Sequence, residues 1–304
     1  FLFLFLYILY RWRQSLSLFI CLALLLWFSV SVFIPHAVPV VSLPVPSGKH
    51  DVGTQIFQWA DSSRAEWFTG EDSTDLRKIM VQIWYPTQKN KNKLRSPYID
   101  NIDLRVKAIG AAGGFPGWLS GHMNLIKTHS YLMGEPLSAQ GPYPLLILSH
   151  GLTGMRQIHT SLIENLASHG YVVAAVDHPY DCNLTVFQDG TVANYRSDIT
   201  GHPDSVNVRK MQLSTRVNDI VFVLEKISEL HSSSSLGEII NLSKVGVLGH
   251  SYGGATAINS TFNDSRFRAC LALDGWMNPL PSVVLQRGIN QPFLSLARPH
   301  WNDS

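Results

Sequence analysis

The sequence predicts an α/β fold, with a mostly parallel central sheet and helices on both faces, after an N-terminal transmembrane segment. Two patterns predict the sheet domain: short continuous apolar runs that alternate with helical stripes, and a serine framed by glycines between one such run and a helix. A stretch of twenty uncharged residues near the N-terminus predicts the transmembrane segment. With 304 residues, the chain is long enough for one large α/β domain.

The composition excludes several classes of protein. Apolar residues make up 45% of the chain, which excludes a disordered protein. The net charge is +2 and no basic stripe occurs, so we expect no nucleic-acid partner. Cys21, Cys182 and Cys270 are too few for a disulfide scaffold and form no CxxC metal knuckle. We assign no cofactor to the chain. A Cys182–Cys270 bridge stays open, although two buried free thiols are the simpler interpretation.

Residues 15–35 predict a transmembrane helix (SLSLFICLALLLWFSVSVFI, closed by Pro35). Twenty residues at about 1.5 Å each span about 30 Å, which is the thickness of a bilayer's hydrocarbon core. Residues 1–14 are interpreted as a partial hydrophobic segment followed by a basic turn at Arg11 and Arg13. A cleaved signal peptide is the alternative. Its apolar region usually runs over about 7–15 residues and ends in an A-x-A-like site, which is not apparent here.

The basic residues also predict the orientation of the membrane segment. Arg11 and Arg13 carry the only formal charges before Gly48, and the positive-inside rule assigns them to the cytoplasm. The rest of the chain is then expected outside the cytoplasm. Residues 36–50 contain three prolines and predict a stiff linker, which leaves residues 51–304 for the α/β domain.

The elements of this domain follow from the period of its apolar residues. Residues 78–84 alternate apolar and polar side chains and predict an exposed antiparallel strand. Continuous apolar runs predict strands that are buried on both faces, at 145–149, 171–176, 245–248, 269–273 and 293–296. Helical stripes cover 156–169 and 206–230. Ligands of such sheets bind beyond the carboxyl ends of the strands, so we expect the chemistry just after these runs.

Residues 249–253 read Gly-His-Ser-Tyr-Gly and lie between a buried strand and a helix. A nucleophile on a tight strand-to-helix turn has strained dihedral angles and a neighbouring chain close by, so only small residues fit at Gly249 and Gly253. The turn presents the Ser251 hydroxyl at a helix N-terminus, which favours developing negative charge. We predict that Ser251 is a catalytic nucleophile; a glycine-rich turn without chemistry is the alternative.

Residues 149–154 (SHGLTG) follow the strand at 145–149. In α/β-hydrolases this turn supplies one N–H group of the oxyanion hole, and the residue after the nucleophile supplies the other. The predicted donors are the backbone N–H groups of Leu152 and Tyr252. His150 is interpreted as a buried structural histidine that holds the loop, and His178 as lining of a pocket near the rim of the site.

The acid and the base are expected in later loops. Asp274 ends a strand, where its carboxylate can orient a histidine, and Asp303 is the second candidate. The order nucleophile, acid, histidine puts the base last. His300 is the only histidine after Asp274 and follows a strand too closely, so no triad histidine is assigned. The simplest expectation is that the final helix, strand and histidine loop lie beyond the sequence given, which leaves residues 51–304 an incomplete catalytic domain.

With these residues placed, the chain resembles the platelet-activating factor acetylhydrolases of the plasma and intracellular type II kind and their bacterial relatives. The matching stretches are MVQIWYP (80–86), GPYPLLILSHGLTG (141–154), LASHGYVVAAVDHPYD (166–181), GHSYGGATA (249–257) and FRACLALDGWMNP (267–279). The resemblance implies an α/β-hydrolase fold with a Ser–Asp–His triad and no metal. It puts the serine on Ser251, the aspartate on Asp274 and the oxyanion amides on Leu152 and Tyr252, and it matches no residue to the histidine. It also implies calcium-independent hydrolysis of short sn-2 acyl groups from phospholipids.

Three functions remain open. The leading hypothesis is a membrane-anchored serine ester hydrolase that acts on phospholipids and contacts the bilayer through residues 15–34. The first alternative is a carboxylesterase of broad specificity or a polyester hydrolase. The second is a membrane-anchored protein of hydrolase fold without catalysis, which a gene ending at Ser304 would favour.

Overall fold

The computed structural model describes residues 2–37, 39–72, 74–88 and 94–298. The chain divides into two compact units, Phe1–Ser42 and Leu43–Ser304.

Among the described residues of the first unit, Leu2–Ala37 form a helix, α1. Its stretch Phe3–Phe33 is long and apolar enough to cross a membrane. The helix continues through Arg11 and Arg13, so the expected basic turn is instead part of the helix. The physical reason is that residues 2–14 contain neither glycine nor proline, and nothing in them interrupts the hydrogen bonding of a helix.

The second unit is built on a sheet, and its described residues form nine strands in the order β11-β10-β9-β5-β6-β2-β1-β4-β3. Neighbouring strands run parallel in the part of the sheet formed by β11, β10, β9, β5 and β6. β2 runs antiparallel to both of its neighbours, β1 and β6. A separate hairpin contains β7 (Leu184–Val186) and β8 (Val192–Asn194). The sheet strands are β1 (Asp51–Ala65), β2 (Leu76–Thr87), β3 (Arg95–Pro97), β4 (Lys127–Leu132), β5 (Tyr143–Ser149), β6 (Val172–Asp177), β9 (Ile240–His250), β10 (Phe267–Leu273) and β11 (Phe293–Leu296).

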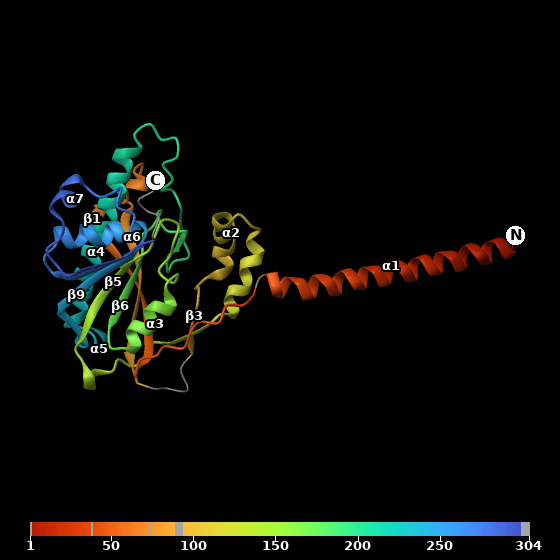
Figure 1. The fold of residues 1–304 in the computed structure, drawn as a ribbon, viewed down its shortest axis with the longest axis horizontal. Coiled ribbons are helices and arrows are strands. Elements are labelled where there is room, and N and C mark those ends of the chain that lie inside the picture. Colours follow the sequence, from red (N-terminus) through yellow and green to blue (C-terminus); the bar gives the residue numbers. More distant parts are fainter. Residues whose placement is uncertain (1, 38, 73, 89–93, 299–304) are drawn as a thin grey trace. The chain divides into compact units, whose positions relative to one another are not determined.

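Helices cover both faces of this sheet (Figure 1). Successive side chains of a strand point to opposite faces. Ile147 of β5 therefore packs in the cluster shared with α4 and α6, whereas Leu148 packs in the cluster shared with α3. The helices are α2 (Ile102–Gly113), α3 (Thr160–Ser168), α4 (Ser205–His231), α5 (Ser235–Glu238), α6 (Tyr252–Asn263) and α7 (Ser282–Arg287), with 3₁₀ turns at Trp67–Thr69, Gly117–Leu125 and Ser138–Gln140.

The strand expected at 78–84 is antiparallel, as predicted, but it is not exposed. β2 lies in the interior of the sheet and is buried along nearly its whole length. Its polar positions are compatible with burial because they are hydrogen-bonded. Gln82, for example, is buried and donates to the Thr54 hydroxyl at 3.0 Å. Alternation of polar and apolar residues was therefore a poor guide to exposure here.

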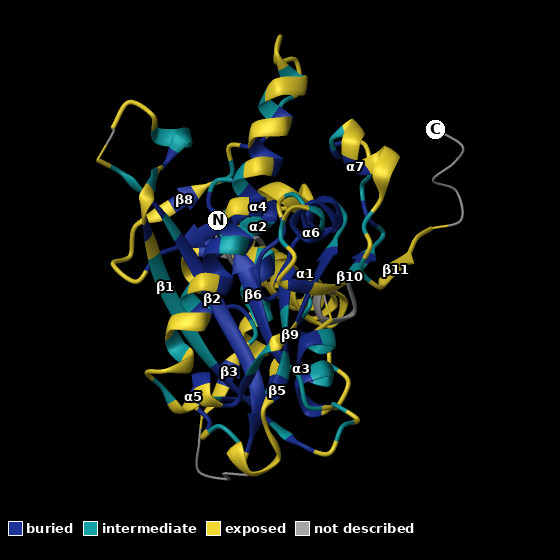
Figure 2. Ribbon diagram, turned by 90° about the vertical axis from the view of Figure 1, so that its left-hand side faces the viewer, coloured by how far each residue is buried: buried dark blue, intermediate teal, exposed yellow. Residues whose placement is uncertain are grey.

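Two further elements differ from expectation. The last apolar run forms β11 at the edge of the sheet, where all four residues are exposed instead of buried (Figure 2). The helix expected over 156–169 begins only at Thr160. The reason for the late start is that Arg156 is held in the preceding turn, where its N–H donates to the Asp177 carboxylate at 2.7 Å.

The expected linker at 36–50 is partly docked on the second unit. The Ser47 N–H donates to the Asn165 side chain at 3.0 Å, and the Gly48 N–H donates to the Ser168 hydroxyl at 3.0 Å. The His50 N–H donates to the carbonyl of Ser168 at 3.1 Å. These bonds to α3 explain why the second unit already begins at Leu43.

Candidate active site

Ser251 forms the one-residue turn between β9 and α6. Its backbone has φ 54° and ψ −118°, a conformation that a non-glycine residue rarely adopts. Main-chain bonds hold it in place, because its N–H donates to the carbonyl of Leu273 at 2.9 Å and its own carbonyl accepts from the N–H of Gly254 at 2.9 Å. The sheet and the helix together therefore enforce the strained turn.

The two glycines around Ser251 have the steric role that the motif requires. A Cβ atom on Gly249 would lie 1.9 Å from the carbonyl oxygen of Gly253. A Cβ atom on Gly253 would lie 2.0 Å from the carbonyl oxygen of Ser149. Both distances are far below van der Waals contact, so neither position accepts a side chain without a movement of the backbone.

The loop after β5 passes directly beside the turn. A Cβ atom on Gly151 would lie 3.3 Å from Ser251 Cβ, and Leu152 is the next residue. The N–H of Tyr252 is the first of α6 and has no carbonyl within the helix to reach. Within the described part of the chain, no hydrogen bond is found for the N–H of Leu152 or for that of Tyr252. Two unengaged main-chain donors thus belong to the elements that flank Ser251.

A buried arginine and a buried histidine fix this loop. Arg216 donates to the carbonyl oxygens of His150 and Gly151 and forms an ion pair with Asp181. His150 Nδ1 lies 2.6 Å from the carbonyl oxygen of Gly151, and His150 Nε2 accepts from the N–H of His178 at 3.2 Å. Burial lowers the pKa of His150 well below its usual value, and Arg216 adds to this, so the ring is neutral. His150 therefore holds the loop, as the sequence analysis expected.

Beneath the loop lies a second set of serine, histidine and aspartate side chains. His178 Nε2 lies 2.9 Å from the hydroxyl of Ser149, and His178 Nδ1 lies 2.9 Å from Asp219 Oδ2. Arg77 pairs with the same carboxylate at 2.7 Å. Burial raises the pKa of Asp219, but Arg77 and His178 outweigh it and hold the pKa well below its ordinary value. Ser149, His178 and Asp219 are completely buried, so this set supports the fold and is closed to substrate. His178 is thus a core residue and not the pocket lining that we expected.

Asp274 begins the loop after β10, next to Ser251. The two loops are linked because the N–H of Trp276 donates to the carbonyl of Ser251 at 2.9 Å. The Asp274 carboxylate pairs with Arg298, whose Nε lies 2.8 Å from Oδ2 and whose main-chain N–H lies 3.3 Å from Oδ1. Within the described ranges no hydrogen bond joins Ser251 to Asp274 or to a histidine. His300 and Asp303, the other candidates of the sequence analysis, lie outside the described residues.

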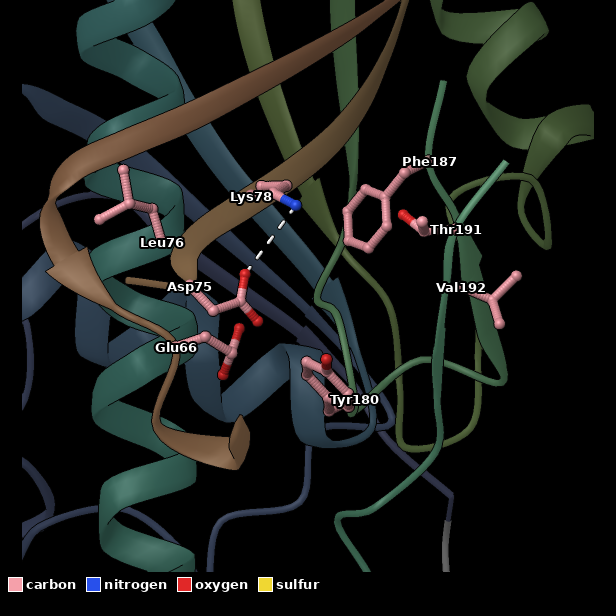
Figure 3. Close-up of a pocket in the computed structure, with 8 residues that line it drawn as sticks. All are labelled: Glu66, Asp75, Leu76, Lys78, Tyr180, Phe187, Thr191 and Val192. Atoms are coloured by element: carbon pink, nitrogen blue, oxygen red, sulfur yellow. Dashed lines mark ion pairs between the residues drawn. The ribbon is translucent and has the colours of Figure 1, made fainter. Parts of the chain in front are cut away.

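A separate pocket of about 220 Å³ lies between the start of β2 and the hairpin of β7 and β8 (Figure 3). Its charged groups are already paired, because Lys78 lies 3.9 Å from Asp75, and Glu66 lies 2.7 Å from Arg77. Neither Ser251 nor Asp274 lines this pocket, so it is not the ester site that the motif predicts.

The candidate metal ligands are engaged within the protein. His150, Asp177 and Cys182 bring ligand atoms within 4.8 Å of one another. Arg156 pairs with Asp177, and His150 is hydrogen-bonded through both ring nitrogens. Burial raises the pKa of Cys182 to about 12, which keeps the thiol protonated. These donors do not fit a metal ion. Cys182 and Cys270 are buried free thiols, and no disulfide joins them.

The sequence analysis missed the buried polar and ionic residues of α4. Arg209, Gln212, Arg216 and Asp219 are all buried on this helix. They are spaced by three or four residues, so these polar side chains lie on the same buried face of the helix as its apolar residues. In the sequence, charged residues at positions that the helical period assigns to the buried face were the signal that could have predicted these buried groups.

The sheet order, the helices on both faces and the strained serine between β9 and α6 define an α/β-hydrolase fold. A solved structure of a ferulic acid esterase from Streptomyces cinnamoneus has a similar fold. It aligns with a TM-score of 0.65 and 29% sequence identity, over 84% of this chain and 67% of the esterase.

The model of the family "Platelet-activating factor acetylhydrolase, isoform II" matches residues 37–303, and the chain belongs to this family. The platelet-activating factor acetylhydrolase of Canis lupus familiaris is 31% identical over 70% of this chain and 53% of its own length. A probable 1-alkyl-2-acetylglycerophosphocholine esterase of Arthroderma benhamiae is 26% identical over 83% of this chain and 64% of its own length. The chain spans about half the length of the mammalian relative.

Proposed function

We propose that this protein is a membrane-anchored serine ester hydrolase that removes short sn-2 acyl groups from phospholipids without calcium. Membership of the acetylhydrolase family supports the reaction class. The observation that carries the proposal is the strained turn at Ser251, with the unengaged N–H groups of Leu152 and Tyr252 on the elements that flank it. A hydroxyl presented in this way is the arrangement that acyl transfer needs.

In the proposed mechanism, Ser251 Oγ attacks the ester carbonyl carbon while a histidine outside the described residues takes its proton. The carbonyl oxygen becomes an oxyanion and accepts hydrogen bonds from the N–H groups of Leu152 and Tyr252. Each such donor contributes about 3–4 kcal/mol to stabilisation of the transition state. The intermediate then expels the lysophospholipid alkoxide, which takes the proton from the histidine. Water hydrolyses the acyl-serine by the same steps and releases the short fatty acid.

Asp274 is proposed to orient that histidine and to stabilise its cationic form. Its place at the end of β10, one loop away from Ser251, supports this role. The role requires the carboxylate to accept the imidazolium in addition to, or in place of, Arg298. Exchange of Arg298 for the imidazolium costs little free energy, because the Arg298 side chain is 70% exposed and exposed ion pairs contribute little to the free energy of folding.

The proposed anchor is α1. A helix of this length and apolarity suits a bilayer, and the hydroxyls of Ser15 and Ser31 donate to carbonyl oxygens one turn earlier, which satisfies them inside the helix. With Arg11 and Arg13 in the cytoplasm, the catalytic unit lies outside it.

The test of the reaction is labelling with a fluorophosphonate, combined with ester assays in the presence of EDTA. We expect the full-length protein to be labelled, Ser251→Ala to lose labelling and hydrolysis, and acetylated phospholipid to be cleaved faster than its long-chain analogue. Equal rates on simple esters would favour the broad carboxylesterase, the alternative that the similarity to a ferulic acid esterase supports. Absence of labelling would favour a protein without catalysis.

A further inference from the structure

A pocket of about 430 Å³ lies between the start of α4 and the loop that follows β10. Its polar lining consists of Ser205, Arg209, Lys210, Asn278 and Ser282, and the ring of Trp276 forms part of its wall. The lining includes two cationic side chains and no carboxylate. The charge of the pocket therefore favours an anion.

Arg209 is the unusual residue of this pocket. It is only 9% exposed, and its Nε and Nη1 atoms have no hydrogen-bond partner in the described part of the protein. The buried Arg77 and Arg216, by contrast, each pair with at least one carboxylate. A buried cation without a hydrogen-bonded carboxylate is costly, because burial removes its hydration. Arg209 also lines the pocket, and its third nitrogen, Nη2, is the donor of this guanidinium that an anion in the pocket would meet first.

The aromatic residues around Arg209 fix its orientation. Its guanidinium carbon lies 5.2 Å from the ring centre of Tyr252 and 5.4 Å from that of Trp276. The two ring centres lie 5.7 Å apart, so the guanidinium lies beside both rings and is restrained by them, which gives its donors a preferred direction toward the oxygen atoms of a phosphate. Asp198 is the acidic group nearby: hydrogen bonds from Thr200, and to a smaller extent the charge of Arg209, lower the pKa of its carboxyl. Asp198 is exposed, does not line the pocket, and forms no ion pair with Arg209 among the described residues.

The start of α4 adds to this preference for an anion. Ser205 is the first residue of this 27-residue helix, and its own N–H donates to the carbonyl of His202 at 3.2 Å. The helix N-terminus as a whole carries partial positive charge. Lys210 is exposed at the same end of the helix and contributes a full charge.

The pocket lies close to the proposed nucleophile. Trp276, in its wall, donates its main-chain N–H to the carbonyl of Ser251, and Tyr252, whose ring contacts Arg209, is the residue after Ser251. In a glycerophospholipid the phosphate is only a few bonds away from the sn-2 ester. An anion site next to Ser251 therefore matches the one fixed charge that every substrate of this class carries.

From this arrangement we propose that the pocket binds the head-group phosphate of the substrate through Arg209, with Lys210 as a second cation. The inference rests on the proposed function, because the ligand is the phosphate of the phospholipid that Ser251 would cleave. It adds a specificity-determining site that favours phosphate-bearing esters over neutral ones.

A direct titration tests the site without any need for turnover. The full-length protein in a maltoside detergent, which carries no phosphate, is titrated with glycerophosphocholine, inorganic phosphate and glycerol. We expect glycerophosphocholine to bind and glycerol not to bind. Arg209→Gln should raise the Kd of glycerophosphocholine about tenfold or more, as expected for lost hydrogen bonds to a charged group. The control is Lys226→Gln, which removes a cation from the same helix about 25 Å away and should leave the Kd unchanged.

A second variant, Lys210→Gln, keeps the proposal falsifiable if Arg209→Gln fails to fold. Because Lys210 is exposed, its substitution should leave the structure intact and should weaken binding of glycerophosphocholine severalfold. Equal binding by the wild type and both variants would overturn the proposal. Binding of inorganic phosphate but not of glycerophosphocholine would also overturn it, since the site would then hold a free anion only.

A kinetic comparison separates this proposal from the proposed function. The measured quantity is the ratio of two kcat/KM values, that for an acetylated phospholipid divided by that for the corresponding phosphate-free acetylglycerol. This ratio should fall about tenfold in Arg209→Gln. It should stay at the wild-type value in Lys226→Gln. If the wild type cleaved neither ester, the hydrolase proposal would fail, while the titration would still decide whether the phosphate site exists.

Discussion

The guanidinium of Arg216 donates to the main-chain carbonyl oxygen of His150, the residue before the glycine that contacts Ser251. Arg216 is 1% exposed and also pairs with Asp181. Because the carbonyls of His150 and Gly151 are held from the interior, the loop is fixed in a position in which the N–H of Leu152 has no hydrogen bond within the described residues. The ion pair in the core thus determines the position of a loop at the candidate active site.

Arg216→Lys should lower kcat by a factor of about 10 or more while it changes KM little, because a lysine cannot hold two carbonyls and a carboxylate in one plane. A lysine that does not reach Asp181 leaves this buried carboxylate without its partner, at a cost of up to about 3–5 kcal/mol of folding free energy. Arg105→Lys is the matched control, since Arg105 is equally buried but binds Asp100 and the carbonyl of Leu184. Equal loss of kcat in the two folded variants would mean that Arg216 is purely structural.

Gly249→Ala should disrupt the turn at Ser251. The added Cβ would lie 1.9 Å from the carbonyl oxygen of Gly253, so the backbone must move. Crowding of this kind costs about 1–3 kcal/mol or more, and we also expect fluorophosphonate labelling to slow strongly. Gly121→Ala is the control, because its Cβ would have no neighbour within 4 Å. Unchanged labelling of Gly249→Ala would contradict the steric account of the motif.

Acid should destabilise the fold through its buried and half-buried histidines. Burial, with a smaller effect of His250, lowers the pKa of His159 to about 4, and burial also lowers the pKa values of His150 and His178. Below pH 6.5 the unfolded chain therefore binds protons that the folded chain does not, and the free energy of unfolding falls as the pH falls towards 4. Asp219, whose pKa is held low, adds a loss only below the unfolded value of about 3.9.

Urea denaturation between pH 7 and pH 4.5 measures this effect. One histidine contributes a slope of up to about 1.4 kcal/mol per pH unit. His159→Gln should reduce the slope, and substitution of the exposed His202 should not. A stability that stays flat over this range would show that the buried rings are not neutral in the folded state.

Substitutions can distinguish the contributions of Asp274 and Arg298 to activity. Asp274→Asn should lower kcat by a factor of about 10³–10⁴, since an amide cannot stabilise a cationic histidine. Arg298→Gln should retain activity and change the free energy of unfolding by less than about 1 kcal/mol, because the side chain is 70% exposed. If Arg298→Gln lost as much activity as Asp274→Asn, the ion pair itself would be the functional unit.

The orientation of α1 can be tested at Lys49, which is exposed at the start of the second unit. In Lys49→Cys, combined with Cys21→Ser, we expect a membrane-impermeant maleimide to label intact cells. The remaining cysteines, Cys182 and Cys270, are buried and serve as an internal control. Labelling only after lysis would reverse the proposed topology, and loss of residues 1–35 from the mature protein would identify a signal peptide.

The sequence by itself determined the class of fold and the turn that presents Ser251, because in both cases a local pattern has one physical solution. The run Val245–Leu248 is apolar enough for a buried strand, and glycines on both sides of Ser251 admit a single kind of turn. Those two facts are sufficient to place the serine at the carboxyl edge of a parallel sheet.

Only the tertiary structure decided which polar residues are buried and what they bind. Gln82 looked exposed in an alternating strand, yet it is in the interior, and His178 looked like pocket lining, yet it is sealed beneath the loop. Their partners, Thr54 and Asp219, are 28 and 41 residues away along the chain. Burial of a polar group depends on whether such a distant partner satisfies it, and no local pattern contains that information.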